Sequence, residues 1–140
     1  MKQSNKAGSS NQIGHYGEEI AVRFLMKHGF QIVERNYTKK WGEIDIVARE
    51  TKSDGVTIRF VEVKTVSYET KAQLEIAVAR GTWRPEEQVD QRKLARLHRA
   101  IESWLAEQRF DGYWEIDVVA VRVVPREKYA TLKYLPNVFL

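Results

Sequence analysis

The stretch Ile58–Lys64, IRFVEVK, has the composition of a buried β-strand, yet it contains a glutamate and a lysine two positions apart. Alternate residues of a strand point to opposite faces, so Glu62 and Lys64 share one face while the flanking valines anchor the other. Burying a charged side chain costs free energy unless the charge is paired or ligates a metal. The stretch therefore predicts a sheet that carries a polar site on one face.

Two strands are predicted before this one, in FQIVERNY (30–37) and GEIDIVARE (42–50). Both segments alternate between apolar and polar residues. On the second strand we expect two faces, one with Ile44, Ile46 and Ala48 and the other with Glu43, Asp45 and Val47.

The polar segment TKSDG (51–55) predicts a hairpin between the second strand and VTIRFVEVKTV (56–66). A turn centred between Ser53 and Asp54 places Asp45 opposite Glu62. A turn centred on Asp54-Gly55 places Asp45 opposite Lys64 instead. Both registers keep Asp45 on the face of Glu62 and Lys64, because they differ by an even number of residues.

An amphipathic helix is predicted from about Gly14 to Gly29. Its apolar arc includes Glu18, which lies three residues before Ala21 and seven before Leu25. The neighbouring Glu19 instead begins a solvated stripe of charges. Glu18 is therefore the glutamate of this helix that points toward the body of the domain.

The second half of the chain predicts another long helix after Pro85 (85–108) and a strand, YWEIDVVAVRVV (113–124), that ends at Pro125. We expect the segment 67–83 to be a loop with a short helical turn, and the end of the chain to add a short edge strand. Helix, three strands, helix and strand predict an α/β fold in which helices flank a sheet.

The 140 residues favour one domain, residues 13–140, after a flexible polar tail over 1–12. The absence of cysteine excludes a disulfide scaffold, a thiolate zinc site and a cysteine nucleophile. No apolar run approaches the ~20 residues that span a bilayer, and no signal peptide is recognisable, so we expect a cytoplasmic protein without a membrane partner. The net charge of +4 permits a polyanionic partner.

The chemistry should centre on Asp45, Glu62 and Lys64, toward which the first helix aims Glu18. Carboxylates that converge repel one another, and a hard cation such as Mg²⁺, which prefers oxygen ligands, relieves that repulsion. A lysine beside it can stabilise charge on a phosphate, or orient or deprotonate water. The alternative is a solvated face or a cross-strand salt bridge, which the apolar surroundings of Glu62 and Lys64 disfavour.

Five motifs in order carry a family resemblance: GHYGEEIAVRFLMKHGFQIVERNY (14–37), GEIDIVA (42–48), FVEVKT (60–65), QVDQRKLARLHRAIESWL (88–105) and WEIDVVAV (114–121). Together they resemble the YraN family of bacterial proteins, whose nearest characterised relatives are Holliday junction resolvases of the PD-(D/E)xK superfamily. The resemblance runs from about Ile13 to the C-terminus. It implies a restriction-endonuclease-like core, a mixed central β-sheet flanked by helices.

The same resemblance implies a metal-dependent endonuclease that hydrolyses phosphodiester bonds in nucleic acid, with DNA favoured over RNA and branched or junction DNA among the substrates. By position, the catalytic residues are Glu18, Asp45, Glu62 and Lys64. Glu18, Asp45 and Glu62 with the backbone carbonyl of Val63 would hold Mg²⁺ or Mn²⁺. Glu43 of the GEID motif either supports these ligands or is merely exposed.

Basic residues supply the nucleic-acid contacts that we expect, on the second long helix (Lys93, Arg92, Arg96 and Arg99) and before the GEID strand (Lys39, Lys40 and Trp41). The tryptophan could stack on a base. For the helix, the alternative is a solvated face, and Lys93 ranks first because it matches a recurrent lysine of the family. A homodimer would supply the two sites that a junction requires.

Two alternatives to a nuclease stay open at this stage. One is a nucleic-acid-binding module of the same fold without turnover. The other is a structural domain in which the charges form a salt-bridge cluster.

Overall fold

The structure is a computed structural model that describes residues 10–81, 83 and 90–138. These residues form three α-helices, five strands and one 3-10 turn. In chain order they are α1 (Ser10–Lys27), β1 (Gln31–Lys39), β2 (Gly42–Lys52), β3 (Gly55–Ser67), α2 (Lys71–Arg80), α3 (Gln91–Gln108), β4 (Tyr113–Val124), η3 (Pro125–Glu127) and β5 (Tyr129–Leu135).

The strands form one mixed sheet in the order β1-β2-β3-β4-β5. Strands β3 and β4 are parallel, and the other neighbours are antiparallel. Parallel neighbours need a long crossover connection, and the segment that contains α2 and α3 supplies it. The α/β fold predicted from the sequence is therefore confirmed, and this helix-flanked mixed sheet is consistent with a restriction-endonuclease-like core.

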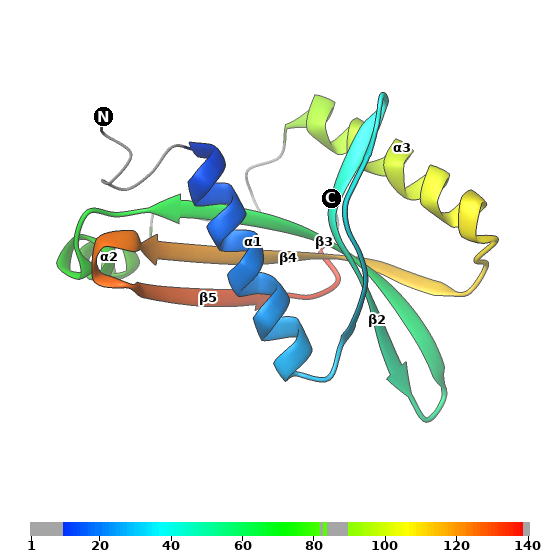
Figure 1. Cartoon of the computed structure of the whole chain (residues 1–140), viewed down its shortest axis with the longest axis horizontal. Coiled ribbons are helices and arrows are strands. Elements are labelled where there is room, and N and C mark those ends of the chain that lie inside the picture. Colours follow the sequence, from blue (N-terminus) through cyan, green and yellow to red (C-terminus); the bar gives the residue numbers. More distant parts are fainter. Residues whose placement is uncertain (1–9, 82, 84–89, 139–140) are drawn as a thin grey trace.

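Two apolar clusters hold α1 and α3 against opposite faces of the sheet (Figure 1). In one, Ala21 and Leu25 of α1 pack on Val61 of β3. In the other, Leu97, Ile101 and Trp104 of α3 pack with Phe60, the residue before Val61. The alternation of β3 thus supplies both cores, as IRFVEVK predicts.

The β2–β3 hairpin adopts the first of the two predicted registers. Lys52 pairs with Gly55, so Ser53 and Asp54 form the turn, and the ladder ends at the pair Ile46 and Val61. One prediction about β2 is wrong, because Ile44 belongs to the α3 cluster, whereas Ile46 and Ala48 belong to the α1 cluster. Before Ile46 the strand pairs with β1 alone, and Ile44 follows its partner Tyr37 toward α3.

Helix α1 begins at Ser10 rather than Gly14, so the last three residues of the predicted tail are helical. Residues 1–9 lie outside the described residues. The predicted C-terminal glycine, Gly29, has φ 90°. No helix in the described parts of the chain is both long and apolar enough to cross a membrane.

Helices α2 and α3 also differ from the prediction. In place of a loop with one helical turn, α2 runs for 10 residues, with Thr70 accepting from the Gln73 amide at its start and Gly81 (φ 62°) at its end. Helix α3 begins at Gln91, where Asp90 caps the Arg92 and Lys93 amides. The predicted start at Pro85 lies outside the described residues.

Candidate functional site

A cavity of about 630 Å³ lies where α1, α3, β2 and β3 meet, and most of the predicted site residues line it. Its polar lining includes Glu18, Glu43, Asp45, Glu62, Lys93 and Arg96. Residues as far apart in the sequence as Ile13 and Leu97 therefore border one space.

Asp45, which is half-buried, and Glu62, which is buried, form the acidic pair of this cavity. The Asp45 Oδ2 atom accepts a hydrogen bond of 2.8 Å from the Val63 amide. Burial, and next the negative charge of Glu62, raise the pKa of Asp45 to about 8, although the Val63 amide opposes the shift. Two carboxylates that repel each other in a partly buried place favour the binding of a cation or a proton.

Glu18 approaches the cavity from α1, as its place in the apolar arc predicts. The preceding Gly17 lies so close to β3 that any side chain there would collide with the Thr65 hydroxyl. The Glu18 Oε1 atom is buried without a hydrogen-bond partner among the described residues. Burial raises the pKa of Glu18, while the nearby Arg35 and His15 oppose the rise.

Two lysines approach Glu62, whose side chain is 8% exposed. Lys93 Nζ of α3 lies 2.9 Å from Glu62 Oε2, and Lys64 Nζ lies 4.0 Å from the same atom. Burial disfavours the charge of Lys93, but its hydrogen bond to Glu62 and attraction to Glu62 and Asp45 outweigh burial and raise the pKa of Lys93. The sequence predicted Lys93 as a nucleic-acid contact, and in the structure its ammonium group forms an ion pair with Glu62.

The donor atoms fit a hard divalent cation that draws further ligands from water and substrate. Among the described residues, no three Asp, Glu or His side chains gather closely enough to form a metal site by themselves. Mg²⁺ typically takes one or two carboxylates and fills its octahedron with waters and phosphate oxygens. Asp45 and Glu62 match that requirement, Val63 lines the same cavity, and the unpartnered oxygen of Glu18 adds a further donor.

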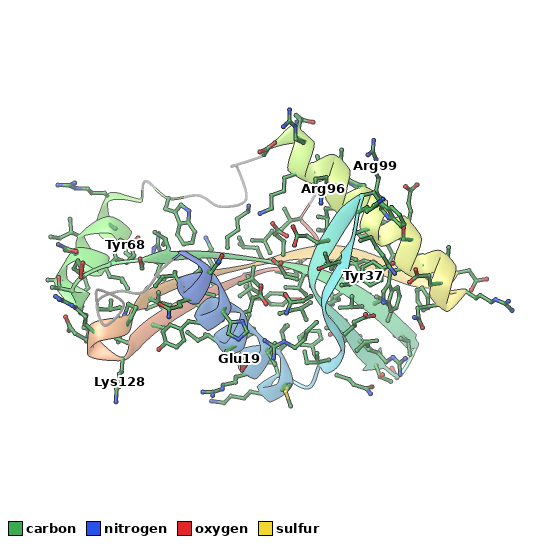
Figure 2. The ribbon with its side chains drawn as sticks, turned by 45° about the horizontal axis from the view of Figure 1, so that its top comes forward. Glu19, Tyr37, Tyr68, Arg96, Arg99 and Lys128 are labelled. Atoms are coloured by element: carbon green, nitrogen blue, oxygen red, sulfur yellow. The ribbon has the colours of Figure 1, made fainter. Side chains whose placement is uncertain are left out.

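The predicted basic residues divide into two groups. Arg96 lines the cavity, Arg92, Arg99 and Lys40 are exposed, and Figure 2 shows Arg96 and Arg99 on α3 beside the β1–β2 strands. Lys39 is instead engaged within the protein, because its Nζ lies 3.3 Å from Glu107 Oε2 and 5.1 Å from the centre of the Tyr37 ring. Glu43, predicted as a supporting or exposed residue, is exposed and borders the cavity.

A second charged cluster, the Arg59–Asp117 network, was missing from the sequence interpretation. Asp117 is fully buried and accepts hydrogen bonds from Arg59 Nη1 at 3.1 and 3.2 Å, from the Tyr134 hydroxyl at 2.5 Å and from the Asn137 amide at 2.9 Å. Arg59 also donates to Glu50 and Glu115. The sequence signal was available, since Arg59 and Asp117 interrupt apolar strands as Glu62 does.

Comparison with known proteins identifies relatives along most of the chain. The model of "Uncharacterised protein family UPF0102" matches residues 17–121. A UPF0102 protein of Nocardia farcinica is 37% identical over 137 residues, which cover 96% of this chain and 94% of that protein. One of Beutenbergia cavernae is 44% identical over 116 residues, which cover 81% and 84% of the two chains. The protein therefore belongs to the uncharacterised family UPF0102, the YraN family of the motif resemblance.

Proposed function

We propose that the protein is a metal-dependent endonuclease that hydrolyses phosphodiester bonds in nucleic acid, DNA in preference to RNA. The observation that carries the proposal is the acidic pair of half-buried Asp45 and buried Glu62 in a cavity that Lys93 and Arg96 also line. A paired acidic site within reach of basic residues matches a substrate that brings phosphate oxygens and requires charge neutralisation.

In this proposal Asp45 and Glu62, with Glu18 and the carbonyl of Val63, hold Mg²⁺ or Mn²⁺. The metal, when bound, neutralises charge on the phosphate and lowers the pKa of water. Lys64 lies on the strand face of Glu62 and orients the attacking water or stabilises the phosphate. Arg96, Arg92 and Arg99 neutralise neighbouring phosphates, with Lys40 on the facing turn.

A cleavage panel tests the catalytic proposal. Purified protein with Mg²⁺ or Mn²⁺ should cut at least one of single-stranded, duplex, flapped and branched DNA, and Lys64→Ala and Asp45→Ala should each remove cutting. Cleavage of a four-way junction on two strands should coincide with a dimer in sedimentation. Intact substrates throughout, together with no metal binding that depends on Asp45, would end the proposal.

A thermal shift gives an independent test of the metal. A ligand that binds only the native state must raise the melting temperature. Mn²⁺ should therefore stabilise the wild type and leave Asp45→Ala unchanged, whether or not a substrate has been found.

A second candidate function is nucleic-acid binding without turnover. The contact that favours it is the 2.9 Å ion pair of Lys93 and Glu62, because it supplies a counter-charge from within the protein. This candidate predicts salt-dependent binding that survives Glu62→Ala and Lys64→Ala, with no rise in melting temperature on addition of metal.

A further inference from the structure

The turn between β1 and β2 exposes a large aromatic ring. Trp41 is 43% exposed, whereas Trp104 of α3 is 3% exposed and packs edge-on against Phe60. An indole ring in water leaves a wide apolar face uncovered, and such rings frequently serve recognition when they are also held in place.

Helix α3 holds this ring in place. The Trp41 indole Nε1 donates to Ser103 Oγ at 2.6 Å, and Arg96 Nη1 donates to the Lys40 carbonyl at 3.3 Å. The next residue, Gly42, lies so close to α3 that any side chain there would collide with the Arg96 carbonyl. Because the indole N–H already has its acceptor, the exposed ring needs no further polar partner. It is an apolar surface whose orientation is fixed before a ligand arrives.

The turn is joined to the acidic cavity by residues that serve both. Arg96 lines the cavity and also binds the carbonyl of Lys40, the residue before Trp41. Glu43, two residues after Trp41, lines the same cavity. Exposed cations accompany the ring, Lys40 on the turn and Arg99 on α3, where Figure 2 shows it near Arg96.

We propose that Trp41 is a stacking platform for an unpaired base, and that the preferred ligand is nucleic acid with single-stranded nucleotides beside the phosphate held in the cavity. Bases inside a duplex are already stacked on both faces, whereas an unpaired base can cover an aromatic side chain. Arg96 and Arg99 then contact phosphates of the nucleic-acid backbone between the stacked base and the cavity of Asp45 and Glu62. This inference rests on the proposed function in one respect, that the ligand is a nucleic acid.

Binding measured in EDTA tests the platform separately from catalysis. Anisotropy of a labelled single-stranded oligonucleotide and of the blunt duplex of the same sequence should be compared for the wild type, Trp41→Leu and Trp41→Phe. Trp41→Leu should weaken single-strand binding about tenfold, within the roughly fivefold to hundredfold that one stacked base contributes, and leave duplex binding unchanged. Trp41→Phe, which keeps an aromatic face, should retain most of the affinity.

Tyr113→Leu is the matched control. Tyr113 is 82% exposed, and it pairs with Thr57, five positions before Glu62 on β3. The substitution therefore removes an exposed aromatic ring well away from the site. This variant should bind both oligonucleotides as the wild type does. Melting temperatures close to that of the wild type would show that both leucine variants are folded.

Tryptophan fluorescence supplies a readout that a merely structural role would not change. Single-strand binding should quench the emission of the wild type, and that quenching should be largely lost in Trp41→Phe although binding persists. Equal single-strand affinity of Trp41→Leu and the wild type overturns the inference, and so does an equal loss for single strand and duplex.

The outcomes also separate the two proposals. Single-strand binding that depends on Trp41, without any cleavage, supports the stacking platform and contradicts the proposed nuclease activity. Cleavage together with binding that does not depend on Trp41 supports the nuclease activity and contradicts the platform. Absence of all nucleic-acid binding overturns both.

Discussion

Strand β3 carries charged residues into both faces of the sheet, and the two faces treat them differently. On one side, Arg59 joins Asp117 in a network in which Asp117 accepts from Arg59, Tyr134 and Asn137. On the other, Asp45 and Glu62 border a cavity in which an oxygen of Glu18 lacks a partner among the described residues. Both clusters contain buried charged side chains, but of the two only the second has a polar atom without a hydrogen-bond partner in the described parts of the chain. This difference distinguishes a candidate binding site from a network that stabilises the fold.

The largest loss of stability should come from breaking the Arg59–Asp117 network. Asp117→Ala removes the fully buried acceptor of Arg59 and leaves its guanidinium with Glu50 and Glu115 only. Breaking one partner out of a buried ionic network costs about 3–5 kcal/mol of unfolding free energy, because a desolvated charge is left uncompensated. Urea denaturation measures the loss, and Glu115→Ala, at the partly exposed rim of the network, should lose less. Equal, small losses would contradict the closed network.

Removing a charge from the acidic cluster of Asp45, Glu62 and Glu18 should instead raise the stability of the protein. Since burial and Glu62 raise the pKa of Asp45 from 3.8 to about 8, the folded protein holds this proton more tightly than the unfolded chain does. The associated stability is complete below pH 4 and is lost as the pH rises toward 8. Without metal, Asp45→Asn should therefore be more stable than the wild type at pH 8.5 and nearly equal to it in stability at pH 4.

Denaturation curves in EDTA at several pH values measure this difference. A difference in unfolding free energy between Asp45→Asn and the wild type that stays constant from pH 4 to 8.5 would show that folding does not raise the pKa of Asp45. Mn²⁺ should reverse the order at pH 8.5, since the proposed metal stabilises only the carboxylate form.

The ion pair of Lys93 and Glu62 should give a smaller effect. The Lys93 side chain is 59% exposed, so solvent weakens the pair, and Lys93→Gln should cost about 1 kcal/mol without metal. Because the ammonium would compete with the proposed metal for Glu62, Mn²⁺ should raise the melting temperature of Lys93→Gln more than that of the wild type. The exposed neighbour Arg92, changed to Gln, is the control and should leave the Mn²⁺ response unaltered. A reduced Mn²⁺ response in Lys93→Gln would show that the lysine assists metal binding.

Charges outside both clusters should have the least effect on stability. Arg99→Ala should stay within about 0.5 kcal/mol of the wild type, because the side chain is exposed. Its nucleic-acid affinity should fall, with the salt dependence of log K reduced by about one. Lys128→Ala, at the opposite end of the molecule in Figure 2, should change neither quantity. An equal loss of affinity in the two variants would assign binding to net charge alone.

The sequence predicts the acidic face well because the period of a strand is two. Both allowed registers kept Asp45 with Glu62, and the structure adopts the one whose turn is Ser53 and Asp54. The family resemblance supplied the restriction-endonuclease-like core, which the mixed sheet matches. The roles of Glu18, Asp45, Glu62 and Lys64 in catalysis stay predictions, although Glu18, Asp45 and Glu62 border one cavity.

What the sequence did not predict depends on long-range packing or on helix ends. Helix α2 buries only Leu74 among its described residues, so apolar periodicity is weak, and its signals are the caps Thr70 and Gly81. The partner of Lys93 depends on how α3 docks across the sheet. The Arg59–Asp117 network depends on the parallel register of β3 and β4, which pairs Arg59 with Glu115 and Val61 with Asp117.

The position of β3 has a consequence for how the protein opens. This strand is hydrogen-bonded to β2 on one side and β4 on the other, and both faces are covered by apolar clusters. Amide hydrogen exchange should be slowest along Phe60 to Val63 and should approach the rate of global unfolding there. The turn that carries Trp41 lies beyond the end of the β2–β3 ladder and should exchange through smaller, local openings. Glu62, which lies between Phe60 and Val63, would then belong to the part of the sheet that unfolds last.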